Sequence, residues 1–125
     1  MEKKVPLDIL IKQSKLNNFD INKSLKIKSY LPLEDKIKYA KIYVDKIIDE
    51  HGNYSSIDKY FKFTMMVFNV YTNLYLDNTH EEYDKLISSG LLDDILNVIK
   101  NDYYDFKEFV EMEFNDKLRI LYMKH

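Results

Sequence analysis

Hydrophobic residues recur with a helical period along most of this chain, and the longest uncharged stretch lies near its middle. Residues 63–76 contain fourteen side chains without a charge, whereas a bilayer span takes about 20 apolar residues. We therefore interpret this stretch as the second half of a buried central helix, capped at its start by Ser55 or Ser56. A helix that is apolar on nearly all sides must be surrounded by neighbours, so other helices are expected to cover it.

Two of these helices are marked by start and stop signals. Pro32 opens a helix over about residues 32–51, because its missing N–H is harmless in the first turn. Gly52 follows as a left-handed cap. Thr79 precedes Glu82 by three residues, which is the capping-box pattern and predicts a short helix there.

The C-terminal part predicts two more helical segments. Residues 91–99 are largely apolar, and Asn101 and Asp102 interrupt the pattern before a last helix. Asp102 can cap that helix, and Asp105 suits its first turn. The expected fold is therefore all-α, with about five helices packed around the central apolar helix and a possible short N-terminal strand or extended arm.

Residues 1–28 form a segment of a different kind. A short helix after Pro6 and an extended arm are both compatible with its pattern. Residues 25–30 alternate apolar and polar side chains as a half-buried strand does. A single strand must pair with the N-terminal arm or with another protein, because its backbone groups need partners; otherwise it does not form. We expect residues 1–28 to be an arm and residues 29–125 to be one helical domain.

Charge is distributed unevenly although the net charge is only -2. Residues 1–41 hold ten lysines and five acids, and residues 42–125 hold nine basic and sixteen acidic side chains. The acids concentrate between residues 77 and 116, where there are twelve of them and three lysines. This half is expected to repel nucleic acid and to attract a basic partner, or simply to keep the protein solvated.

Residue types that carry catalysis or metal binding are scarce. The chain has no Cys, which excludes disulfides, thiolate zinc sites and a Cys nucleophile. Its two glycines stand alone, so no phosphate-binding loop is predicted. His80 is followed by acids but lacks the second histidine of an HExxH zinc site.

Paired carboxylates are the remaining candidates for a catalytic or metal-binding role. Asp93 with Asp94, and Asp102 with Asp105, resemble the raw material of acid–base or two-metal sites. Neighbouring residues on a helix point about 100° apart, and both pairs lie where caps and solvent-facing positions are expected. We predict no enzyme activity, no cofactor, no metal and no catalytic residue.

Protein contact is the interpretation that the eleven tyrosines favour, because Tyr is enriched at binding hot spots. Four tyrosines fall off the apolar stripes and are predicted at the surface: Tyr30, Tyr43, Tyr54 and Tyr104. The candidate partner-binding residues combine the lysines of the arm, two of these tyrosines and the paired carboxylates: Lys23, Lys26, Lys28, Tyr30, Tyr104, Asp93, Asp94, Asp102 and Asp105.

Three segments resemble a known group of proteins. Residues 29–36 read SYLPLEDK, residues 71–74 read YTNL, and residues 83–93 read YDKLISSGLLD. This pattern is similar to small proteins encoded by phages and prophages of low-GC Gram-positive bacteria, and the abundance of Lys, Ile, Asn and Tyr fits an AT-rich genome. The resemblance implies a non-enzymatic phage protein from the virion-assembly genes, and it transfers no functional residue.

The leading hypothesis is a head or tail component or assembly factor that binds proteins of the phage or host, with residues 23–30 pairing with a neighbouring subunit. A homo-oligomer is compatible with this role, and neither nucleic acid nor a membrane is expected as a partner. An alternative is an inhibitor that presents the acids of residues 77–116 to a nucleic-acid-binding defence enzyme of the host. A DNA-binding regulator that uses the lysines before residue 42 is a third. The expected location is the host cytoplasm, with incorporation into the virion left open.

Overall fold

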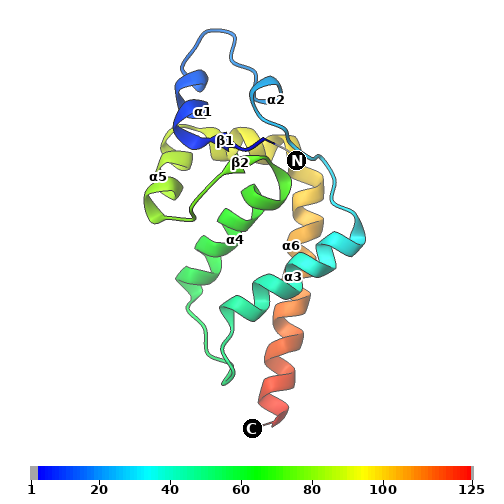
Figure 1. Cartoon of the computed structure of the whole chain (residues 1–125). Coiled ribbons are helices and arrows are strands. Elements are labelled where there is room, and N and C mark those ends of the chain that lie inside the picture. The colour runs from blue at the N-terminus through cyan, green and yellow to red at the C-terminus, as the bar shows by residue number, and fades with distance from the viewer. Residues whose placement is uncertain (1–2, 125) are drawn as a thin grey trace.

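Six helices and one two-stranded parallel sheet make up residues 3–124, the part of the chain that this computed structural model describes (Figure 1). The predicted all-α fold is confirmed, with more helices than the five expected. In chain order the elements are β1 (Val5–Pro6), α1 (Leu7–Ser14), α2 (Ile21–Ser24), α3 (Leu33–Ile47), α4 (Ser56–Tyr71), β2 (Leu74–Tyr75), α5 (His80–Ser88) and α6 (Leu91–Lys124).

The core consists of two clusters of buried side chains, and α4 contributes to both. One cluster lies among α3, α4 and the later part of α6, and it includes Val44, Tyr71 and Phe106. The other lies among α1, α4, α5 and the start of α6, and it includes Leu10 and Phe68. Because α4 is shared in this way, it holds the central position that its apolar sequence predicts.

Helix α4 was predicted to be buried on nearly all sides, and this prediction is wrong for its first turns. Ile57 is 82% exposed and Tyr60 is 63% exposed, since the neighbouring helices cover only the later turns. The predicted helical extension through residue 76 is also wrong. Thr72 caps the end of α4, and its hydroxyl donates to the Phe68 carbonyl oxygen and accepts from the Leu74 N–H. The chain then continues as β2.

Helix α6 is continuous for 34 residues, so the predicted interruption at Asn101 and Asp102 is wrong. Its buried residues keep one helical stripe across that point: Leu91, Ile95, Ile99, Phe106, Val110 and Phe114. In Figure 1 the yellow first part of α6 runs across the upper half of the molecule, below α1 and α2, and the orange and red part runs down to the C-terminus. The two parts bury their side chains in different clusters, the first beside α1 and α5 and the second beside α3.

The N-terminal segment is folded into the domain. The short helix after Pro6 is confirmed as α1, and β1 pairs in parallel with β2. Leu7, Leu10 and Leu25 are buried in the second core cluster. Residues 3–28 thus pack against the rest of the domain, whereas residues 1–28 are predicted to be an arm.

The strand predicted over residues 25–30 is reduced to one antiparallel bridge between Ile27 and Thr72. The Lys28 N–H donates to the Tyr71 carbonyl oxygen at 2.7 Å, and the Asn73 N–H donates to the Lys26 carbonyl oxygen at 3.2 Å. The segment thus finds backbone partners at the end of α4, and not in the N-terminal arm. Pairing with another protein stays a prediction.

The predicted and observed helix boundaries agree best where a side chain caps the backbone. The Ser55 hydroxyl accepts from the Asp58 N–H, and Thr79 and Glu82 form a complete capping box. Helix α3 ends at Ile47, four residues before the predicted end. Gly52 has the expected left-handed φ of 85°, and it lies in the turn that follows this helix.

Candidate functional site

A buried ionic cluster joins α3, α4 and α6. The Lys36 Nζ lies 2.7 Å from Asp102 Oδ1 and 2.8 Å from Asp105 Oδ2. Asp102 Oδ2 accepts hydrogen bonds from the Tyr71 hydroxyl at 2.6 Å and from the Leu31 N–H at 2.9 Å. The Lys36 side chain is 3% exposed and that of Asp102 is 8% exposed, so the main pair is removed from water.

Proton affinities in this cluster follow from its geometry. Burial by itself would lower the pKa of Lys36, but the hydrogen bonds to Asp102 and Asp105 outweigh it and raise the pKa. Burial would raise the pKa of Asp102, and the donors Lys36, Tyr71 and Leu31 more than reverse that and lower it. The pKa of Tyr71 is raised, first by burial and then by its bond to the Asp102 carboxylate.

This cluster connects three helices and presents no group to a substrate. Both oxygens of Asp102 already accept from protein donors, so this carboxylate has no free position aimed at a substrate. Within residues 3–124, no group of three or more His, Cys, Asp or Glu side chains is arranged to hold a metal ion. The cluster ties three helices together at the upper end of the first core cluster.

Three of the candidate partner-binding residues meet at this cluster. Asp102 and Asp105 bind Lys36 directly, and the ring centroid of Tyr30 lies 4.8 Å from Lys36 Nζ. Tyr30 is exposed, and the Asp105 side chain is 58% exposed. Asp102 is also predicted to bind a partner, and its side chain is buried and bonded to α3 and α4.

The other candidates are exposed but lie on separate elements. Lys23 belongs to α2, and Lys26 and Lys28 lie in the segment that follows. Asp93 and Asp94 lie in the first turn of α6. The exposed position of Tyr104 is confirmed, whereas Tyr43 is buried and donates its hydroxyl proton to the Lys59 carbonyl oxygen. No single site gathers these residues.

The burial of Lys36 was not predicted, although the sequence contains a pattern that indicates it. It stands four residues before Ala40, which in turn precedes Val44 and Ile47 in one row of α3. All four side chains are buried. A lysine in register with an apolar stripe, on a chain with unpaired carboxylates elsewhere, would have indicated a buried ion pair.

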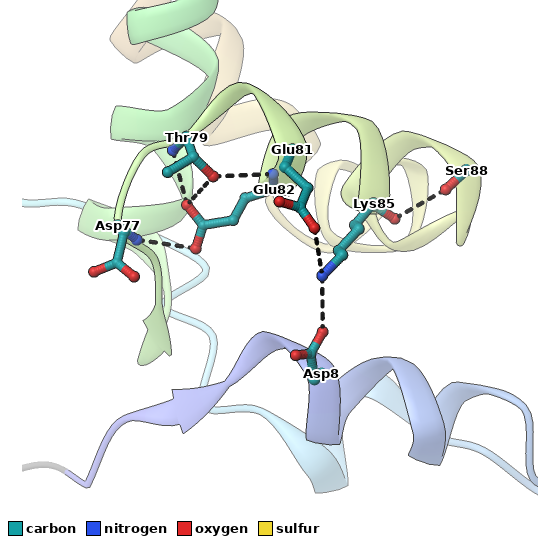
Figure 2. A network of polar contacts seen from close by, with 7 residues as sticks. All are labelled: Asp8, Asp77, Thr79, Glu81, Glu82, Lys85 and Ser88. Atoms are coloured by element: carbon teal, nitrogen blue, oxygen red, sulfur yellow. Dashed lines mark hydrogen bonds and ion pairs between the residues drawn. The ribbon is translucent and has the colours of Figure 1, made fainter.

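A second polar network lies at the surface, between α1 and the start of α5 (Figure 2). Glu82 accepts from the backbone N–H groups of Asp77 and Thr79. Lys85 Nζ lies 3.2 Å from Asp8 Oδ1 on α1 and 3.3 Å from Glu81 Oε1. Several acids of the 77–116 region are thus engaged within the chain, in capping α5 and in fastening α1 to it.

A largely apolar groove lies between α3 and α4. Its volume is about 620 Å³, and α3 and α4 supply most of its lining, including Ile42, Lys46, Phe61, Lys62, Met65 and Met66. No acidic side chain lines it. Lys62 Nζ lies 3.8 Å from Asp58 on the exposed surface, and Lys46 has no ion pair within residues 3–124. The groove therefore combines an apolar floor with a positive edge.

No protein-family model, curated protein or solved structure matches this chain. Over residues 3–124, no helix combines the length and the apolar character that crossing a membrane requires. The surfaces described above, together with the sequence patterns, are therefore the basis for a function.

Proposed function

We propose that this chain is a non-enzymatic phage protein that works by binding another protein through the groove between α3 and α4. Its role would be that of a component or assembly factor of the phage head or tail. The observation that carries the binding proposal is the groove itself, about 620 Å³ of largely apolar space edged by Lys46 and Lys62.

The lining chemistry supports protein binding in particular. A groove between two helices is a common seat for an amphipathic helix, which inserts side chains from one of its faces. Met65 and Met66 line the floor, and methionine side chains adapt to differently shaped partners. Ile57 and Tyr60 extend the exposed apolar surface along α4 beyond Phe61. Contiguous apolar surface of this kind marks interaction sites.

The proposed role in a phage is supported by the sequence and not by the groove. It rests on the resemblance of residues 29–36, 71–74 and 83–93 to small phage and prophage proteins. The host cytoplasm and, after assembly, the virion are the corresponding locations. Both locations belong to the proposal.

Site-specific photocrosslinking tests the groove. A benzoylphenylalanine replaces Met66, which lines the groove, and in a control it replaces Lys12, which is exposed on α1. In the cells that naturally make the protein, illumination should join the Met66 variant to one protein of defined mass, identified by mass spectrometry. Equal adducts from both positions, or none from Met66, would contradict the proposal.

An inhibitor that presents its acidic surface remains the second candidate. Asp93 and Asp94 are exposed at the start of α6 and have no ion pair within residues 3–124, so they are free to face a basic groove. Binding through such charges should weaken steeply as salt rises, whereas binding in the apolar groove should persist. A charge reversal at Asp93 and Asp94 that leaves partner binding unchanged would exclude this candidate.

A further inference from the structure

We infer that the occupant of the α3–α4 groove is a second copy of this chain, which inserts the outer face of its own α6. The inference rests on the proposed function, because it names the partner of the same groove. It is carried by two surfaces of opposite charge on one chain.

The outer face of α6 is the first of these surfaces. Tyr104 is 56% exposed and Met112 is 51% exposed, and they lie eight residues apart on the side of α6 that faces away from α3. Glu108 lies between them, and a shallow hollow of about 630 Å³ follows this face. Met123, three turns after Met112, is exposed on the same side towards the C-terminus. Tyr104, Met112 and Met123 are thus exposed apolar side chains on this face, with acidic side chains between them.

Charge distinguishes this ridge from the groove. Between residues 104 and 116, α6 carries five acids and one lysine. Among residues 3–124, the charged residues that line the groove are Lys46 and Lys62, and no acid lines it. Asp58 lies beside the groove, 3.8 Å from Lys62. An acidic, apolar helix face and a basic, apolar groove are complementary in both properties, and such complementarity steers association and fixes register.

The two surfaces cannot meet within one molecule. Helix α3 packs its buried side chains against Val110 and Phe114 of α6, and Tyr104 and Met112 lie on the opposite side of that helix, so α6 itself separates this face from α3 and from the groove. Contact therefore requires two copies, joined head to tail. A heterologous contact of this kind builds a ring if its rotation closes and a filament if it does not. Each copy carries both the groove and the α6 face, so the two surfaces are always present in equal amounts.

Charge-reversal variants of the full chain test the inference. The groove variant carries Lys46→Glu and Lys62→Glu. The helix variant carries Glu108→Lys, Glu111→Lys and Asp116→Lys, which leaves two acids and four lysines between residues 104 and 116. Light scattering over a series of concentrations should show a mass above that of one chain for the wild type. Each variant alone should stay at the mass of one chain, because its groove and its α6 then carry the same sign.

Mixing the two variants gives the decisive result. The acidic groove of one then faces the basic α6 of the other, and the unchanged groove faces the unchanged α6, so the oligomer should return. A control with Lys12→Glu and Lys15→Glu, exposed residues outside both surfaces, should behave as the wild type. Circular dichroism melting of every variant identifies any loss of folding.

Three outcomes would overturn the inference: a wild type that stays monomeric at every concentration, reversals that leave the oligomer intact, or a mixture that stays monomeric. Crosslinking then separates this failure from that of the proposed function. A monomer whose Met66 position joins a foreign protein keeps the groove as a binding site with another occupant. A monomer without any adduct at Met66 removes both.

Discussion

Lys36 on α3 and Asp102 on α6 form an ion pair of 2.7 Å with both side chains buried, although 66 positions separate them in the chain. Removing two charges from water is unfavourable, and a buried pair holds only when further hydrogen bonds satisfy its remaining atoms. Here Asp105, Tyr71 and Leu31 supply those bonds. The pair therefore fixes how α3 lies against α6, and hence one wall of the groove.

Replacing Asp102 with Asn should be strongly destabilising. The substitution keeps the shape and an acceptor for Tyr71, but it leaves the Lys36 ammonium buried without its main counter-charge. Breaking a buried pair in this way costs about 3–5 kcal/mol, which denaturant unfolding would measure. The matched control is Asp105→Asn, whose largely exposed carboxylate should contribute about 1 kcal/mol or less.

A double variant separates charge from shape. Adding Lys36→Met to Asp102→Asn removes the orphaned ammonium, so we expect at least half of the lost stability to return. A double variant no more stable than Asp102→Asn alone would show that the loss arises from packing or from the bond to Tyr71, and not from an unpaired charge.

Stability should depend on pH in a direction set by this cluster. The pKa of Asp102 lies below its usual 3.8, so its stabilising effect is present above about pH 4 and is lost as the pH falls through the folded value. The pKa of Lys36 is raised above 10.5, so its effect is present below that pH and is lost as the pH rises through the folded value. The stability difference between wild type and Asp102→Asn should shrink at acid pH. A difference that stays constant down to pH 2 would contradict the assignment.

Asn73 should be essential for attaching the N-terminal segment. Its side chain accepts from the Lys26 N–H at 2.9 Å and donates to the Lys3 carbonyl oxygen at 2.8 Å, and the residue is buried. Asn73→Ala removes two hydrogen bonds to partly buried backbone groups, which costs about 1–3 kcal/mol. Hydrogen exchange should then accelerate at the Lys26 amide first. Asn69→Ala, at an exposed position on α4, should leave that amide protected.

The N-terminal helix should stabilise the whole domain. Leu10 is fully buried beside Phe68 and Ile95, so Leu10→Ala should cost about 2–5 kcal/mol. Leu16→Ala, at an exposed position, should change stability by about 0.5 kcal/mol or less. A chain shortened to begin at Ser29 loses Leu7, Leu10 and Leu25 together and should not unfold as one cooperative unit. Full cooperativity in that chain would mean that residues 1–28 are a separate arm after all.

Two capping signals confined to one turn of chain were predicted correctly, whereas the one at Asp102 was not. Thr79 and Glu82 form the predicted capping box, and Ser55 caps α4 as expected. Such interactions involve residues three positions apart and depend little on the rest of the molecule. The amphipathic rows of α3 and α6 were visible for a related reason, because one side of each helix must be buried.

The sequence by itself determined the helical class, the caps and most of the buried rows, since these follow from local propensity and period. Only the tertiary structure decided that α6 continues through Asn101 and Asp102, because the acid that resembled a cap is satisfied by Lys36 from another helix. It also decided that residues 25–28 pair with the end of α4, where Asn73 and Tyr71 offer backbone partners. Partners distant in sequence satisfy the same polar groups that a local cap or a neighbouring subunit could, and the one-dimensional pattern does not distinguish between them.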